Sequence, residues 1–382
     1  MVNTVPLFPL LKAVYPGEPD FRVCESCVMD TSAPEISFDE LGVCNYCASG
    51  RQLVGKSWFP DSAGEEKLAE TFAEILKRRG RRFSGFDSIL GLSGGVDSAT
   101  VAVRAVEAGL RPLCVHVDGG WNSEESVQNI RNLVDRLGVR LETVVIDWDS
   151  MRKLQLAFLR SGTLNQDIPQ DHAFFVSLYR MSLRRRLPNI LSGLNMATEN
   201  SEPESWGYSN KDAEHIKSVY RAHVGKTLKR FPLMDYRTYK ALRRKGRFRV
   251  IEPLNFGTYD PKNSREFLSQ NMGWQDYGSK HEESVFTKWF QAVYLPERYG
   301  IDKRKAHQSS LVIAGLTTRA DAQTLVSRPP IDSAGRERLC STVADKLRIS
   351  IDELETLIKT PHVSNHSFKT VLPSWNSPGV RT

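Results

Sequence analysis

The sequence contains no run of eighteen apolar residues, so no membrane-spanning helix is expected. The stretch from Met1 to Lys12 contains two prolines and lacks a basic leading segment, which argues against a signal peptide. Together these absences make the cytoplasm the expected location. With 382 residues the chain is long enough for two or three domains, and its 40% hydrophobic and 25% charged content is typical of a globular protein.

Acidic residues are outnumbered by basic ones, 45 against 52, which gives a formal net charge of +7. A positive balance favours anionic partners such as nucleotides, sugar nucleotides or RNA, although an ordinary basic surface stays open. The densest basic stretch is Arg243–Arg249, which contains one aromatic residue. It could contact RNA or a substrate diphosphate, or it could be an exposed loop.

Cysteine is scarce outside one short region. Four of the six cysteines stand in the arrangement Cys24-x2-Cys27-x16-Cys44-x2-Cys47, which has the spacing of a zinc ribbon. Four thiolates make a closed tetrahedral site with no open position, so we expect a structural Zn²⁺ ion rather than a catalytic one. The remaining Cys114 and Cys340 each stand alone and resemble small buried hydrophobic residues.

The glycine-rich loop of this chain lacks the lysine that a Walker A loop needs after its glycines. An apolar run ends in Ser93-Gly94-Gly95-Val96-Asp97-Ser98, and a helical pattern follows at once up to Glu107. Because the first turn of a helix carries unpaired N–H groups and a partial positive charge, this arrangement predicts an anion site. Ser93 and Ser98 can add hydroxyl donors, whereas Asp97 suits a helix cap or a Mg²⁺ ion.

These six residues resemble the signature of the PP-loop ATP pyrophosphatases, a group that includes NAD, GMP and asparagine synthetases and tRNA thiolases. The resemblance implies that ATP is split between its α and β phosphates, with an adenylated substrate as intermediate. It implies ATP and Mg²⁺ as cofactors, nucleotide contacts from the whole motif, and catalytic roles for Asp97 and Ser98. An ordinary strand-to-helix turn with two glycines is the alternative.

Alternating strand and helix patterns indicate an α/β fold with a parallel, doubly wound sheet. Strands are expected at residues 86–92, 111–117, 141–146 and 189–193, and helices at 65–79, 97–107, 123–137 and 171–187. Ligands of such sheets bind at the carboxyl ends of the strands. Asp118 therefore stands where an adenosine could pass, or simply in a turn, and His116 within the strand is expected to be a core histidine.

A second polar motif follows the strand expected at 189–193. PP-loop enzymes carry a Gly-x-Asn sequence with a following acid at this stage, and Gly193, Asn195 and Glu199 occupy the matching positions. The resemblance implies that Asn195 bonds ribose or phosphate and that Glu199 holds Mg²⁺, with structural capping as the alternative. Residues 201–207 and 211–224 are expected to leave the nucleotide core.

The cysteine region carries a more specific resemblance. Cys24-Glu-Ser-Cys27-Val-Met-Asp-Thr-Ser-Ala-Pro34 and Phe38-Asp-Glu-x-Gly-Val-Cys44-Asn-Tyr-Cys47 resemble the opening of the N-acetyl sugar amidotransferases of the WbpG and PseA type. A later block from His281 to Arg319 resembles the same family. Late basic residues in PP-loop enzymes often reach the pyrophosphate, so Lys288 and Arg304 are candidate catalytic residues.

That family turns an acetamido group of a sugar into an acetamidino group during bacterial surface-glycan biosynthesis, including lipopolysaccharide O-antigen. The resemblance implies an AMP-forming amidotransferase that adenylates an acetamido sugar, UDP-linked or not, and replaces the oxygen with ammonia. It also implies a separate glutaminase and an ammonia-conducting subunit. Glutamine hydrolysis within this chain would need a nucleophilic cysteine, but Val2 follows Met1, and neither Cys114 nor Cys340 is flanked by glycine.

Two other functions stay open. A tRNA thiolase also pairs a zinc ribbon with a PP-loop, but it usually needs further cysteines, so nucleic acid is not the expected partner. A nucleotide- or RNA-binding regulator would form no pyrophosphate with any substrate. The expected domains are residues 1–60 with the ribbon at about 22–50, a PP-loop ATP-binding domain at 61–255, and a mainly helical region at 256–382 that completes the active site.

Overall fold

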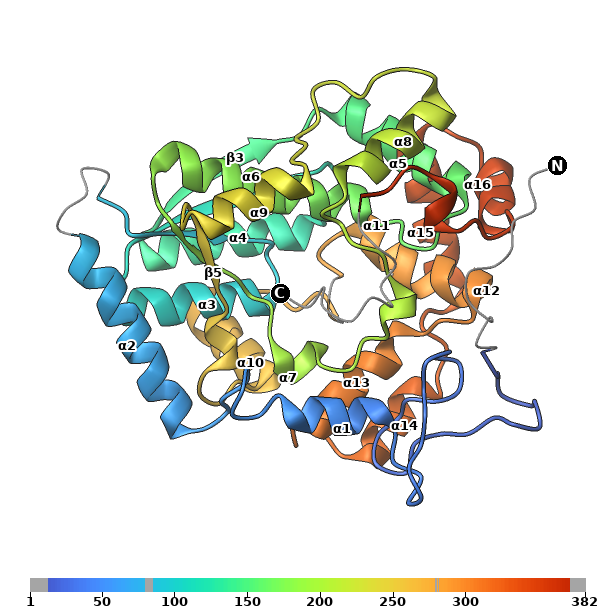
Figure 1. The fold of residues 1–382 in the computed structure, drawn as a ribbon, viewed down its shortest axis with the longest axis horizontal. Coiled ribbons are helices and arrows are strands. Elements are labelled where there is room, and N and C mark those ends of the chain that lie inside the picture. The colour runs from blue at the N-terminus through green and yellow to red at the C-terminus, as the bar shows by residue number, and fades with distance from the viewer. Residues whose placement is uncertain (1–12, 80–84, 279, 281, 372–382) are drawn as a thin grey trace.

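A computed structural model describes residues 13–79, 85–278, 280 and 282–371, and every structural statement below concerns these residues. The expected alternation of strands and helices is confirmed, and the helices cover both faces of a central sheet (Figure 1). Met1, Val2 and His281, which entered the sequence argument, lie outside the described residues. The proposed domain boundaries at residues 60 and 255 stay a prediction.

Five parallel strands form the sheet in the order β3-β2-β1-β4-β5. The strands are β1 (Ser88–Gly91), β2 (Pro112–Asp118), β3 (Arg140–Val145), β4 (Asn189–Leu191) and β5 (Arg249–Ile251). The chain moves outward from β1 to β3 on one side and returns to β4 on the other, so a topological switch point lies between β1 and β4. Ligands of open α/β sheets bind at such a point.

The helices up to residue 272 pack on the strands of the sheet or on one another. They are α2 (Ser62–Arg79), α3 (Val96–Glu107), α4 (Glu124–Leu137), α5 (Trp148–Ser161), α6 (Ile168–Arg185), α7 (Met196–Glu199), α8 (Ala213–Val224), α9 (Tyr236–Arg244) and α10 (Pro261–Met272). Successive side chains of a strand point to opposite faces. Accordingly, Ile89 belongs to a core with Phe158 of α5 and Tyr179 of α6, whereas Leu90 belongs to another with Phe72 of α2.

The prediction that residues 211–224 leave the nucleotide core was wrong. Helix α8 packs against α5. Its Ile216 and Val219 are fully buried, in the same core as Ile89 of β1. The apolar residues at helical spacing in this segment therefore mark a helix that packs on α5 and shares its core.

The C-terminal region is helical, as expected, and gathers a third core around Phe286, Trp289 and the four cysteines. Its helices are α11 (Val285–Trp289), the π-helical turn η3 (Phe290–Tyr294), α12 (Leu295–Tyr299), α13 (Lys303–Ile313), α14 (Arg319–Val326), α15 (Ser333–Leu347) and α16 (Ile351–Ile358). The N-terminal α1 (Asn45–Gln52) packs against α13 (Figure 1). Among the described residues no helix combines the length and the apolar character that crossing a bilayer requires.

Candidate active site and cysteine cluster

The loop between β1 and α3 is a tight turn that only glycine permits. Gly94 has a φ of +88°, and a Cβ there would lie 2.5 Å from the carbonyl oxygen of Ser126. The Ser93 hydroxyl accepts the N–H of Gly95 at 3.1 Å, and the Ser98 hydroxyl donates to the Gly95 carbonyl at 3.1 Å. Two hydroxyl groups therefore stand at the first turn of α3, where the helix favours negative charge.

The second polar motif meets this loop directly. A Cβ at Gly193 would lie 3.0 Å from the backbone nitrogen of Ser98, so the absence of a side chain allows the close approach. The Asn195 amide donates to Asp97 Oδ2 at 3.2 Å, while its Oδ1 accepts the N–H of Thr198 at 3.0 Å. Asn195 thus caps α7 and at the same time holds the Asp97 carboxylate in place.

Lys280 bridges the two acids of these motifs. Its Nζ lies 3.1 Å from Asp97 Oδ2 and 2.6 Å from Glu199 Oε1, and the lysine side chain is nearly buried. Burial alone would lower the pKa of Lys280, but the charges of Asp97 and Glu199 outweigh that effect and raise it. The Tyr259 hydroxyl donates to the other oxygen of Asp97. The result is a closed cluster of two acids and one lysine at the start of α3.

Tyr277 and Glu283 approach the loop from the same segment as Lys280. The Tyr277 hydroxyl and Glu283 Oε1 lie 3.0 Å and 3.1 Å from the position that a Cβ of Gly95 would take. Burial raises the pKa of Glu283, and the nearby charge of Asp97 adds to this. The buried Glu283 Oε2 has no hydrogen-bond partner among the described residues. An unsatisfied buried oxygen beside the first turn of α3 could accept a hydrogen bond from a ligand or contact a cation.

A small pocket opens beside this cluster. Asp97, Tyr277 and Lys280 line it together with Arg265 of α10 and His307 of α13. Burial lowers the pKa of His307 to about 4, so its ring is neutral near pH 7. The PP-loop, α10 and the C-terminal helix α13 therefore contribute residues to one site.

Three predicted residues make other contacts. Asp118 accepts from the Gly120 N–H at 2.8 Å and shapes the turn after β2, next to the buried His116, which is a core histidine as expected. Lys288 pairs with Glu282 at 2.6 Å. Arg304 pairs with Asp302 at 2.7 Å and donates to the Arg328 carbonyl at 2.7 Å. Within the described part of the chain, neither Lys288 nor Arg304 bonds the loop, so their pyrophosphate contacts stay predictions.

Sequence reasoning missed Tyr259, Tyr277, Lys280 and Glu283. Each is brought to the loop by tertiary structure from more than 150 positions away along the chain. One contact that positions this segment is the Trp274 indole, which donates to the Gly94 carbonyl at 3.1 Å. Glu283 lies within the block from His281 to Arg319, but that resemblance assigns it no role, and the other three residues stand in no local motif.

The four cysteines form a compact buried cluster. Their sulfur atoms all lie within 4.8 Å of one another, with Cys24 to Cys47 at 3.9 Å and Cys27 to Cys44 at 3.6 Å. Four thiolates around one zinc ion, each about 2.3 Å from it, would be roughly 3.8 Å apart. Backbone N–H groups of Ser26 and Met29 point to the sulfurs of Cys24 and Cys27. The cluster is therefore compatible with a structural Zn²⁺ ion.

The C-terminal helices hold this cluster in place. The Arg319 guanidinium donates to the carbonyl oxygens of Cys24 and Cys27, at 2.7 Å and 3.1 Å. Lys305 of α13 forms an ion pair with Asp30 at 2.5 Å. These contacts join the two segments whose sequence motifs resemble the same family.

Comparison with family models matches two segments of the chain. Residues 69–231 match the NAD synthase family. Residues 283–378 match the C-terminal domain of LPS biosynthesis protein WbpG-like proteins. Together with the parallel five-stranded sheet, the first match gives the α/β PP-loop fold that the sequence predicted.

Two curated relatives are NAD synthetases. The chain is 31% identical over 156 residues to the glutamine-dependent NAD(+) synthetase of Rhodobacter capsulatus, covering 38% of this chain and 28% of that protein. It is 23% identical over 171 residues to the NH(3)-dependent NAD(+) synthetase of Pyrococcus horikoshii, covering 43% and 63%. The chain thus spans less than two thirds of either relative.

Solved structures give weaker likenesses. The NH3-dependent NAD synthetase of Campylobacter jejuni is 13% identical, with 78% of this chain and 98% of that chain covered and a TM-score of 0.31. The NMN synthetase of Francisella tularensis is 13% identical, with 78% and 97% covered and a TM-score of 0.34.

Proposed function

We propose that this chain, which joins a PP-loop segment of the NAD synthase type to a WbpG-like C-terminal domain, is an ATP-dependent amidotransferase that acts on an acetamido sugar. The observation that carries the proposal is the Asp97–Lys280–Glu199 cluster at the loop. It combines PP-loop residues with a lysine from the segment that leads into the WbpG-like domain. The product would be an acetamidino sugar for a bacterial surface glycan such as O-antigen.

The chemistry proceeds in two steps. The acetamido oxygen attacks the α-phosphorus of ATP, a P–O bond forms, and the bond to the β-phosphate breaks to release pyrophosphate. Ammonia then adds to the imidate carbon, the C–O bond breaks, and AMP leaves with that oxygen. An amide is a poor electrophile, and adenylation supplies the missing leaving group. A protein assists such a reaction mainly by positioning the reactants and neutralising phosphate charge.

The residues of the loop have separate roles in this proposal. The backbone turn Ser93–Ser98 and its two hydroxyls receive the phosphates at the N-terminus of α3. Asp97 and Glu199 are the acids placed to hold Mg²⁺, which would offset the negative charge of the phosphates. The buried Asn195 keeps Asp97 oriented through its amide.

Lys280 is the cation that pairs with both acids. Its single positive charge offsets part of the negative charge of Asp97 and Glu199, which repel each other within a largely buried site. When Mg²⁺ and ATP enter, the acids gain another cation, and we propose that Lys280 turns from the carboxylates to the phosphates. Lys280 is therefore a stronger candidate than Lys288 for the pyrophosphate contact.

Zinc, nitrogen supply and location complete the proposal. The four cysteines hold a structural Zn²⁺ ion, since their cluster is closed and packs on the C-terminal helices. Ammonia comes from a separate glutaminase through an ammonia-conducting subunit, because Cys114 and Cys340 are buried. Reactions that consume ATP for sugar activation take place in the cytoplasm, which is where we expect this enzyme.

The direct test is AMP and pyrophosphate release by the purified protein with ATP, ammonium and a panel of diacetamido sugars, free and UDP-linked. We expect release that requires both sugar and ammonium. Replacing ammonium with glutamine should abolish turnover by the isolated chain. AMP release without any sugar, or efficient use of glutamine, would contradict the proposal. Sulfur transfer to tRNA in place of these activities would favour the thiolase alternative.

A further inference from the structure

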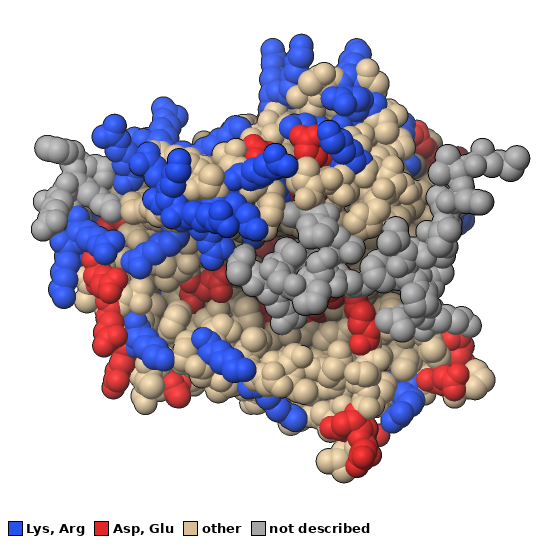
Figure 2. Space-filling model, viewed as in Figure 1, with Lys and Arg blue, Asp and Glu red and all other residues tan. Residues whose placement is uncertain are grey.

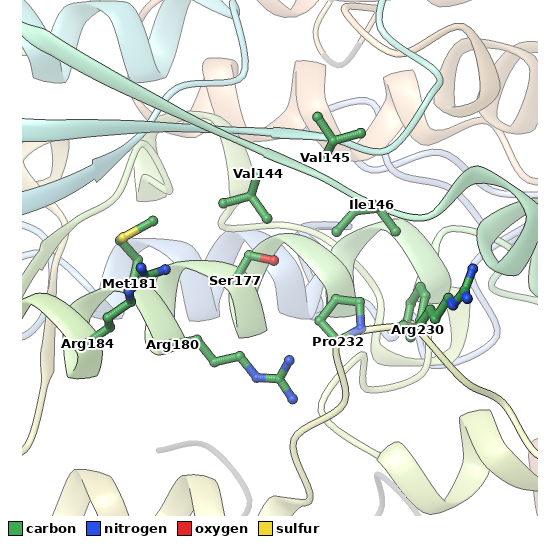
Figure 3. Close-up of a pocket in the computed structure, with 10 residues that line it drawn as sticks. Val144, Val145, Ile146, Ser177, Arg180, Met181, Arg184, Arg230 and Pro232 are labelled. Atoms are coloured by element: carbon green, nitrogen blue, oxygen red, sulfur yellow. The ribbon is translucent and has the colours of Figure 1, made fainter.

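A second pocket, with a volume of about 420 Å³, lies beside the edge strand β3. Val144 and Ile146 line it from the carboxyl end of this strand, and α6 runs along its other side (Figure 3). The loop with Arg230 and Pro232 closes one end. The described residues that line it are entirely different from those of the pocket at the PP-loop.

Three arginines line this pocket. Arg180 of α6 donates to the Leu233 carbonyl at 2.9 Å. The guanidinium groups of Arg184, one turn later on the same helix, and of Arg230 make no hydrogen bond or ion pair with any described residue. Hydrogen bonds from Ser150, and then the charge of Arg230, lower the pKa of Asp147, so one acid lies near Arg230 just outside the lining. The described lining contains no acidic side chain. Like charges four residues apart on a helix repel each other, so such a group of cations is suited to an anionic ligand.

The backbone of Arg230 supports a role for its side chain. Its φ is +55°, in the left-handed region that a residue with a Cβ seldom adopts. A glycine or asparagine would adopt this conformation more readily. Strain of this kind is found where surrounding structure must place a side chain, and here it places a guanidinium at the pocket.

Apart from Ser177 of α6, the rest of the lining is apolar. Met181 of α6 and Pro232 of the loop lie around the same space as Val144 of β3 and Ile146, which directly follows that strand (Figure 3). Phe231 also lines the pocket. The volume lies in the range of small-molecule sites, which combine apolar walls with a few polar groups. A simple inorganic anion would make no apolar contact with these side chains. The ligand that fits has a ring for the apolar wall and phosphates for the guanidiniums.

We infer that this pocket binds the nucleoside diphosphate part of a ligand. Arginine forks match phosphate oxygens two at a time, and guanidinium planes also stack on bases. The source could be a free nucleotide or the nucleotide end of an activated sugar, and both present the same chemistry. The inference does not rest on the proposed amidotransferase reaction, because it concerns binding at residues outside the PP-loop.

The surroundings favour anion capture. In Figure 2, lysine and arginine side chains crowd the upper part of the view, over α9 and its neighbours, where few acidic side chains are seen. A surface whose charges are mostly of one sign raises the local concentration of oppositely charged ligands. RNA would also be attracted to such a surface, so it becomes an outcome of the test.

The test is calorimetric titration of the full chain with UDP. Arg184→Gln and Arg230→Gly remove the unpaired charges at exposed positions, and glycine suits the φ of residue 230. Each should weaken UDP binding about tenfold, because a hydrogen bond to a charged group is lost. The control is Arg328→Gln, an exposed arginine outside the pocket, which should leave the affinity unchanged. A second control is Asp97→Asn, which should also leave it unchanged.

Two further ligands, UDP-GlcNAc and pyrophosphate, show which molecule supplies the nucleoside diphosphate and whether the nucleoside itself is recognised. UDP-GlcNAc matching UDP identifies a nucleotide-linked sugar as the source, and binding by UDP alone identifies a free nucleotide. Pyrophosphate binding as tightly as UDP would overturn the nucleoside assignment. Loss of UDP binding in Asp97→Asn but not in Arg184→Gln would place UDP at the PP-loop and overturn the site. Binding of an RNA oligonucleotide without any UDP binding would overturn it as well.

Discussion

The cysteine cluster and the PP-loop cluster are built in opposite ways. All four sulfur ligands of the first come from 24 residues, Cys24–Cys47, and their spacing alone places them together. The second needs Asp97, Glu199 and Lys280, which are spread over more than 180 positions of the chain. One site is therefore a property of a short segment, and the other is a property of the whole fold.

This difference separates what each site contributes. A closed site of local ligands stabilises the fold around it. In the proposed function, the charges of a site gathered from distant segments rearrange when ATP and Mg²⁺ bind, so that site can respond to a ligand. We therefore expect damage at the cysteines to appear in stability and damage at the Asp97 cluster to appear in turnover.

The largest effect is expected for Asp97→Asn. The amide keeps the shape of the side chain but removes the charge that pairs with Lys280 and would face Mg²⁺. AMP formation should fall by about a factor of 10³, as for other losses of a key electrostatic contact. Ser93→Ala should also lose AMP formation, and both variants should stay folded. Asp149→Asn, which alters an exposed ion pair, is the matched control and should be fully active.

A smaller loss is expected for Lys280→Met, which keeps the length of the side chain and removes its charge. The value of kcat/KM for ATP should fall about 10²-fold, because one phosphate contact is removed. Comparison with Lys288→Met decides which lysine serves the pyrophosphate. An equal or larger fall in Lys288→Met would restore the prediction made from the sequence.

The cysteine cluster should behave differently. Cys24→Ser should release zinc and lower the free energy of unfolding by more than about 3 kcal/mol, because losing a structural metal is among the most damaging changes. Elemental analysis and chemical denaturation measure the two effects. Cys340→Ala, which alters a cysteine outside the cluster, should retain zinc. Native protein that contains no zinc would end this part of the account.

The smallest effect is expected at the contact between α14 and the cysteine cluster. Arg319→Gln removes a guanidinium that donates to the carbonyls of Cys24 and Cys27, so unfolding should become easier by about 2 kcal/mol. Zinc should be retained, because no ligand changes. Thermal denaturation beside Arg328→Gln, which should cost less than about 0.5 kcal/mol, shows whether the anchor is specific.

The sequence predicted the parts whose causes are local. The strand–loop–helix around Gly94 and the Cys24–Cys47 spacing depend on neighbours in the chain, so both could be predicted from it. Strand β5 was missed because its three residues follow a basic run. Helix α5 was missed, although Asp147 caps it by accepting from the N–H of Ser150 at 3.1 Å.

The same limit applies to the candidate site, where only residues in a short motif could be predicted from the sequence. Gly193, Asn195 and Glu199 could be named because they stand in one short motif, and the structure brings them to Asp97. Lys280 could not be named, since its position depends on how the C-terminal region folds back on the sheet. Arg304 was named for its charge, but the structure pairs it with Asp302 and nearby carbonyls. Charge in a sequence predicts a partner without saying which one.

The most direct test of the central claim follows the oxygen of the acetamido group. A diacetamido sugar labelled with ¹⁸O at that position is turned over with ATP and ammonium, and the products are analysed by mass spectrometry. The account predicts that the label appears in the phosphate of AMP, because this oxygen attacks the α-phosphorus and leaves with it. Label found in inorganic phosphate or retained in the sugar product would contradict it.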